Sequence, residues 1–82
     1  MNDLARSSKQ LGQLVRKRRR ALKLTQTELA QKVGSYQKTI SKLEVGEPGI
    51  KLQTMFDVIA ALELELVVQS RSKSDARIED LF

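Results

Sequence analysis

One stretch, residues 25–44 with the sequence TQTELAQKVGSYQKTISKLE, restricts the fold of this chain more than any other. Thr25 and Glu28 have the spacing of a capping box, in which each side chain accepts a hydrogen bond from the backbone N–H of the other residue at the start of a helix. The apolar stripe of that helix ends at Gly34, where a positive φ costs little. A second helix begins at about Tyr36, so this stretch predicts two short helices joined by a tight turn.

The two sides of the second helix differ in chemistry. Tyr36, Ile40 and Leu43 lie at helical spacing and form its apolar side. The other side carries four side chains that can donate hydrogen bonds: Gln37, Lys38, Ser41 and Lys42. A glycine turn, an apolar inner side and a donor-rich outer side together favour a helix-turn-helix, whose second helix enters the major groove of DNA.

The domain expected around this pair covers residues 9–69 and follows a flexible N-terminus at residues 1–8. Ser8 is the expected N-cap of a first helix that runs to about Leu22 or Lys23. Its apolar residues recur at helical spacing, so one side of this helix faces the core.

A loop at residues 45–51 holds two Gly and the only Pro of the chain. Residues 52–62 then repeat apolar side chains at the spacing of an amphipathic helix. We expect Met55 and Phe56 of this helix to pack in the core rather than to bind a cofactor.

The pattern changes at residues 64–69, which read as a β-strand without a second strand to pair with. A lone strand leaves its backbone groups unpaired, so we expect it to pair with the same strand of another copy around a two-fold axis. The expected contacts of this homodimer are Leu64, Leu66, Val67 and Val68. The alternative is that the preceding helix continues through this segment. Residues 70–82 are expected to form a disordered tail.

These elements predict a mainly α fold, a domain of four to five helices with one C-terminal strand. Basic charge is concentrated in one half of it: residues 9–42 hold ten Lys and Arg against one acidic residue, whereas residues 43–82 hold four against eight. A basic surface attracts phosphate and gives salt-dependent affinity for DNA of any sequence. Arg18, within the run of basic residues at positions 16–20, is a candidate phosphate contact.

Composition narrows the function classes. The 82 residues include no Cys and no His, so the usual metal ligands and the usual general base are missing. With no phosphate-binding glycine loop and no convergent carboxylate pair either, we expect no catalytic site, no metal and no cofactor. No apolar run approaches the roughly 20 residues that span a bilayer, and the N-terminus has no signal-peptide core, so we expect a cytoplasmic protein.

The stretch TQTELAQKVGSYQKTISKLEVG resembles the helix-turn-helix of the Xre group, which includes the phage Cro proteins and repressors with the lambda-repressor-like fold. The segment IKLQTMFDVIAALELELVV, passing from helix to strand, is similar to the HipB-type antitoxins. That resemblance implies a small dimeric repressor that binds operators in its own promoter and pairs with a HipA-like serine/threonine kinase toxin. It also implies that the strand joins that of the other subunit.

The resemblance also implies roles for single residues. Gln37 and Lys38 match positions that face base edges, where Gln suits adenine and Lys suits guanine. Ser41 and Lys42 lie one turn further along the helix. Three further assignments are Gln26 and Thr39 as phosphate contacts and an ion pair between Arg19 and Glu44.

Tyr36 replaces the small Ser or Thr that this family often has before the recognition helix, and Ser35 could cap that helix instead. HipB-type antitoxins can end in an aromatic residue that contacts the toxin, and Phe82 is the matching candidate here.

The favoured function is a homodimeric repressor on a palindromic operator, acting as the antitoxin of a type II toxin–antitoxin pair. The alternatives are a stand-alone Xre regulator, or an interaction module whose basic first helix binds an acidic partner.

Overall fold

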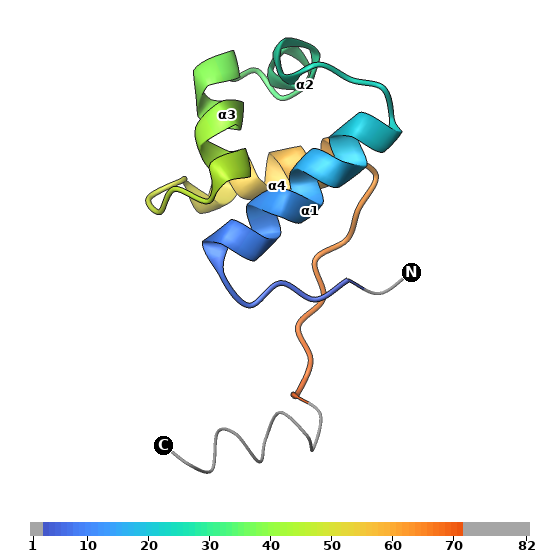
Figure 1. The fold of residues 1–82 in the computed structure, drawn as a ribbon, viewed down its shortest axis with the longest axis vertical. Coiled ribbons are helices and arrows are strands. Elements are labelled where there is room, and N and C mark those ends of the chain that lie inside the picture. The colour runs from blue at the N-terminus through green and yellow to red at the C-terminus, as the bar shows by residue number, and fades with distance from the viewer. Residues whose placement is uncertain (1–2, 72–82) are drawn as a thin grey trace.

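Four helices account for the regular secondary structure of residues 3–71, the part of the chain that the computed structural model describes. They are α1 (Ser8–Ala21), α2 (Gln26–Lys32), α3 (Gln37–Val45) and α4 (Leu52–Ala61). Figure 1 shows α2 and α3 at one end of the domain, while the extended segment after α4 runs toward the other end. The mainly helical fold expected from the sequence is confirmed.

The ends of the helices follow from their local sequence. Thr25 N–H donates to Glu28 Oε1 at 2.8 Å, and Glu28 N–H donates to Thr25 Oγ1 at 3.0 Å, so the capping box is present. The hydrogen bond that the backbone N–H of Thr25 donates to the Glu28 carboxylate lowers the pKa of that carboxyl, and the side chain of Thr25 lowers it further. Gly34 has a φ of +65°, which ends α2 as expected.

The cap of α1 lies one residue earlier than expected. Ser7, not Ser8, has the extended backbone of an N-cap, and its Oγ accepts from Gln10 N–H at 3.1 Å. The sequence SS offers two equivalent hydroxyls, and the choice between them depends on where the chain turns into the helix. α1 ends at Ala21, just before the expected Leu22.

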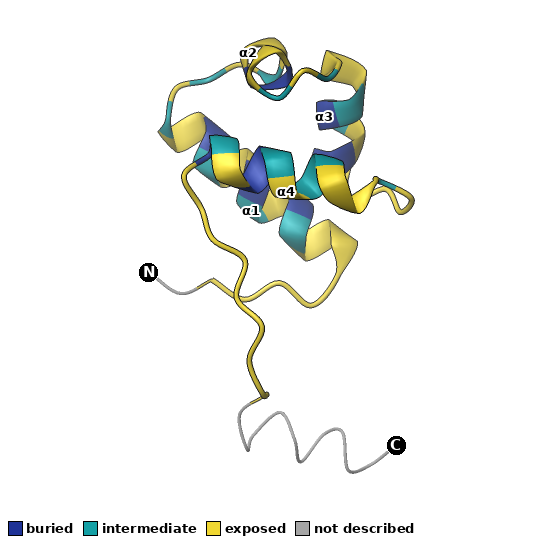
Figure 2. Cartoon of the chain, turned by 180° about the vertical axis from the view of Figure 1, so that it is seen from behind, coloured by how far each residue is buried: buried dark blue, intermediate teal, exposed yellow. Residues whose placement is uncertain are grey.

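The core lies where the four helices meet, and Figure 2 shows its residues on their inner sides. Its fully buried side chains come from all four helices or their immediate ends: Val15, Leu29, Ile40, Leu43, Val58 and Leu62. Met55 packs against this cluster, but Phe56 is 45% exposed, so its expected place in the core is wrong. Val58 and Leu62 set the inner side of α4, which turns Leu52 and Phe56 toward the surface.

Two glycines allow α1 to approach the end of α3 closely. A Cβ at Gly12 would lie 2.6 Å from the carbonyl oxygen of Glu44 and would also meet that of Leu43. A Cβ at Gly46, which ends α3 with a φ of +87°, would lie 2.5 Å from Lys9 Cα. Because both obstacles are backbone atoms, the crossing of α1 and α3 requires glycine at both positions.

The end of α4 shows that the helix does not continue into residues 64–69. Glu63 has a left-handed φ of +58°, and Leu64 N–H donates back to Ile59 O at 3.0 Å, which closes the helix end. Arg18 Nε donates to Leu62 O at 2.9 Å and ties α1 to the same point. Residues 64–71 form neither a helix nor a strand in this single chain, so the expected strand at residues 64–69 is not seen here. The strand pairing between two copies therefore stays a prediction.

None of the helices in the described range is long and apolar enough to cross a membrane.

Replacing Gly12 by Ala tests the close approach. Alanine has the higher helix propensity by about 1 kcal/mol, so a helix judged alone would gain stability. Here the added methyl meets backbone carbonyls, and we expect the variant to lose about 1–3 kcal/mol of unfolding free energy in urea. The exposed neighbour Gln13 is the control, since Gln13→Ala should stay within about 0.5 kcal/mol of the parent. Equal stability of Gly12→Ala and the parent would contradict the packing.

Candidate nucleic-acid interface

The exposed side of α3 carries the residues expected to read bases. Gln37, Lys38 and Lys42 are exposed and Ser41 is half-buried, while Ile40, Leu43 and Glu44 of the same helix are buried. We call Gln37, Lys38, Ser41 and Lys42 the reading face. The anchoring of α3 through its apolar side thus leaves these donors accessible to a large ligand, which is what major-groove recognition requires.

A buried ion pair holds α3 against α1. Arg19 Nε donates to Glu44 Oε2 at 2.6 Å and Arg19 Nη2 donates to Glu44 Oε1 at 3.1 Å, in the two-point geometry that suits guanidinium and carboxylate. The side chains are 9% and 2% exposed respectively. Arg19 Nη1 also donates to Leu24 O at 2.7 Å, just before α2. Since the charges are buried together and hydrogen-bonded, neither is left without a partner.

The same carboxylate reaches the reading face through two glutamines. Gln26, the first residue of α2, donates from Nε2 to Glu44 Oε1 at 3.0 Å. Gln37, the first residue of α3, donates from Nε2 to Gln26 Oε1 at 2.6 Å. We call Arg19, Glu44, Gln26 and Gln37 the polar network. It connects the buried side of α1 to the exposed start of the recognition helix.

The polar network restricts what Gln37 can do. Its amide uses one N–H on Gln26, so the second N–H and the carbonyl oxygen stay available. A donor and an acceptor side by side are what the N7 and N6 groups of adenine require in the major groove. The bond to Gln26 restrains the amide before any ligand arrives, which lowers the entropic cost of binding.

The other expected contacts have different surroundings. Thr39 is half-buried on α3. Arg18 has its Nε engaged by Leu62 O, so only its remaining guanidinium N–H groups could reach a phosphate. Phe82 lies outside the described residues.

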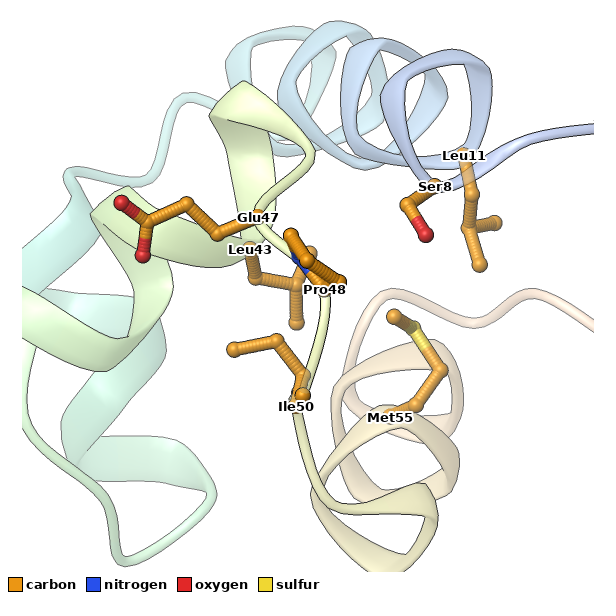
Figure 3. Close-up of a pocket in the computed structure, with 8 residues that line it drawn as sticks. Ser8, Leu11, Leu43, Glu47, Pro48, Ile50 and Met55 are labelled. Carbon is orange, nitrogen blue, oxygen red and sulfur yellow. The ribbon is translucent and has the colours of Figure 1, made fainter.

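A small cavity of about 100 Å³ lies between the start of α1, the loop after α3 and α4 (Figure 3). Its wall is mainly apolar, and the only polar side chains in it are Ser8 and Glu47. It contains no member of the polar network. Within residues 3–71, His, Cys, Asp and Glu side chains do not gather into a group that could hold a metal ion. The candidate site is therefore the surface of α3 rather than this cavity.

Comparison with known proteins agrees with this geometry. Residues 15–68 match the helix-turn-helix family HTH_3, which covers well over half of the chain. The chain belongs to the Xre-type helix-turn-helix family. These proteins bind DNA. The reading face lies on α3, the second helix of the helix-turn-helix, and in such motifs the second helix enters the major groove. A search of curated proteins gives no match.

Solved structures of HipB are similar to this helix-turn-helix domain over most of its length. A HipB variant in complex with the O2 20mer is 30% identical, with a TM-score of 0.81 over 88% of this chain and 100% of that one. HipB in complex with the O4 20mer is 31% identical, with a TM-score of 0.79 and coverages of 87% and 100%. A complex of HipA, HipB, O2 and O3 gives 31% identity, a TM-score of 0.80 and the same coverages.

Sequence reasoning did not find the bond between Gln26 and Gln37. A signal was present, because a Gln stands at the first position of each helix of the pair, and these positions meet when the helices cross. The contact of Arg18 with the end of α4 had no comparable signal, since it joins residues 44 positions apart.

Removing the charge of Glu44 tests the polar network as a structural element. In Glu44→Gln the guanidinium of Arg19 stays buried without its carboxylate, and we expect a loss of about 3 kcal/mol in unfolding free energy. The matched control is Glu47→Gln, which makes the same change at an exposed position and should stay within about 0.5 kcal/mol of the parent. Similar denaturation midpoints for both variants would mean that the ion pair contributes little.

Proposed function

We propose that this helix-turn-helix protein is a sequence-specific transcriptional repressor that binds operator DNA as a homodimer. The observation that carries the proposal is the polar network, which holds Gln37 in a fixed orientation at the exposed start of α3. We propose a regulator rather than an enzyme, because the matching family and the similar HipB structures are DNA-binding proteins.

The reading face divides the recognition task along α3. Gln37 pairs with adenine through its free N–H and carbonyl oxygen, and Lys38 donates to guanine O6 and N7. Ser41 and Lys42 lie one turn further along α3 and contact bases or phosphates there. Gln26 and Thr39 contact the phosphates that flank the groove, and these contacts set the position of the protein on the duplex.

Electrostatics adds an affinity that does not depend on sequence. Exposed basic side chains lie on α1 as well as on α3, and on α1 they include Arg16, Lys17 and Arg20. The two helices pack against each other. Each cation that neutralises a phosphate releases counterions, so the affinity for any duplex falls as salt rises. Discrimination between sequences then rests on the reading face.

The segment after α4 supports a homodimer. Its exposed apolar side chains are Leu64, Leu66, Val67 and Val68, with exposures of 36%, 49%, 68% and 93%. Leu52 and Phe56 add apolar surface on α4. In the homodimer the strands pair around a two-fold axis, which satisfies their backbone groups and covers these side chains. The two recognition helices then enter successive major grooves about 34 Å apart.

We also propose that the repressor is the antitoxin of a HipA-like kinase toxin and regulates its own operon. Support comes from the similarity to HipB in a structure that also contains HipA. Phe82 is the proposed toxin contact. A kinase-like gene directly beside the gene of this protein supports the pairing, whereas its absence favours a stand-alone regulator.

Truncating Gln37 tests the DNA-binding proposal. Selection from a random duplex pool supplies the operator, and fluorescence anisotropy measures its affinity. We expect Gln37→Ala to lose about 1–3 kcal/mol of binding free energy and to relax the preference at one base pair, because the bidentate contact is gone. Gln31→Ala, the same change at an exposed position of α2, should bind like the parent. A parent protein that shows no duplex affinity at low salt would remove the proposal.

Proline scanning tests the paired strand. Consecutive residues of a strand direct their N–H groups to opposite edges, so either Leu66→Pro or Val67→Pro must remove a bond of the ladder. We expect the parent to sediment as a dimer and at least one variant to sediment as a monomer with unchanged helix content. Val67→Thr, which keeps the N–H and the β-branch, should remain dimeric. Dimers of both proline variants, or a monomeric parent, would contradict the pairing.

A further inference from the structure

Tyr36 is the least expected side chain near the reading face. It occupies the N-cap position of α3 with φ −117° and ψ 149°, yet its side chain makes no capping hydrogen bond. The residue is 79% exposed, more than any other aromatic residue in the described part of the chain, so its expected place on the apolar side of the helix with Ile40 and Leu43 is wrong. The N-cap is Tyr36 and not Ser35, the alternative that the sequence offered. A large ring therefore stands in water at the start of the recognition helix.

Tyrosine at this position stabilises the start of α3 less than a capping residue would. Ser, Thr, Asn or Asp at an N-cap would satisfy a free N–H of the first turn. The chain uses such caps at the starts of α1 and α2, where Ser7 and Thr25 accept hydrogen bonds. Lys51 before α4 makes no capping hydrogen bond either, so the missing cap alone does not single out Tyr36. What distinguishes Tyr36 is that a large ring with no capping role stands exposed beside the reading face, and such departures from local rules concentrate at functional sites.

The backbone around Tyr36 is well fixed. Its carbonyl oxygen accepts from Thr39 N–H at 3.0 Å and from Ile40 N–H at 3.2 Å. The next residue, Gln37, is bonded to Gln26 through its side chain. The ring therefore starts one residue before the proposed adenine contact, at the end of α3 that leads into the groove. We expect a duplex that contacts Gln37 to come within reach of Tyr36 as well.

We propose that Tyr36 is a specificity-determining residue whose ring packs against the C5-methyl group of a thymine beside the base pair that Gln37 reads. This inference rests on the proposed DNA-binding function. The thymine methyl is the apolar group that base pairs display in the major groove, so it matches the apolar ring of Tyr36. Covering both removes from water a ring that the free protein leaves exposed.

Three changes test the contact, using the full-length protein and its selected operator. Tyr36→Ser supplies a capping hydroxyl, so it should raise the urea midpoint of unfolding while it weakens operator binding about 5- to 30-fold. Opposite changes in stability and affinity would not arise from a purely structural role. Tyr36→Phe keeps the ring and should bind within about twofold of the parent.

The third change is made in the DNA. Deoxyuridine in place of a single thymine removes only the methyl group, and at one position it should weaken the parent about fourfold. The same change should leave Tyr36→Ser unaffected, because that variant has no ring to contact the methyl. A cost that is equal in parent and variant would overturn the inference.

Two other outcomes would also overturn the proposed contact between Tyr36 and the thymine methyl. Operator binding by Tyr36→Ser as tight as that of the parent would overturn the inference, although the parent would still bind DNA as proposed. Equal losses in Tyr36→Phe and Tyr36→Ser would assign the effect to the hydroxyl and a phosphate, which would also overturn the methyl contact. A parent that binds no duplex would instead remove the proposed function itself.

Discussion

The buried ion pair between Arg19 and Glu44 is the interaction on which the arrangement of this domain depends. Taking two charges out of water is costly, and the cost is offset only when geometry and further hydrogen bonds are good. Here the guanidinium meets both carboxylate oxygens and also Leu24 O, while the carboxylate accepts in addition from Gln26. The pair therefore joins α1, the approach to α2, and α3 through one set of mutually satisfied groups.

The glycines make that geometry available. Gly12 and Gly46 let α1 lie directly on the end of α3, where side chains at either position would meet backbone atoms. This close approach brings Arg19 within reach of Glu44, and the core residues behind them keep the crossing in place. Because Gln37 is connected to the same carboxylate, the packing of the interior determines the orientation of a side chain on the surface. Fold and proposed recognition thus share a single set of contacts.

The sequence predicted features that depend on neighbouring residues. The capping box at Thr25 and the left-handed turn at Gly34 were both expected, because their signals lie within a few positions. The reading face was expected too, since helical spacing separates its donors from Ile40 and Leu43.

Features that depend on tertiary packing were missed or misplaced. The apolar residues of α4 cover so much of the helix that more than one of its sides could face the core. The burial of Val58 and Leu62 determines which side does, and Phe56 lies outside it. Residues 64–69 find no partner strand inside one chain, because the expected pairing requires a second copy.

We propose that Gln26 orients Gln37 for recognition, and a double-mutant cycle on operator affinity tests this most directly. The free energy of binding is compared for the parent, Gln26→Ala, Gln37→Ala and the double variant. If the bond between the two side chains matters in the complex, the loss in the double variant is smaller than the sum of the single losses by about 0.5–3 kcal/mol. Losses that add to within about 0.5 kcal/mol would show that the two glutamines act independently and would contradict the account.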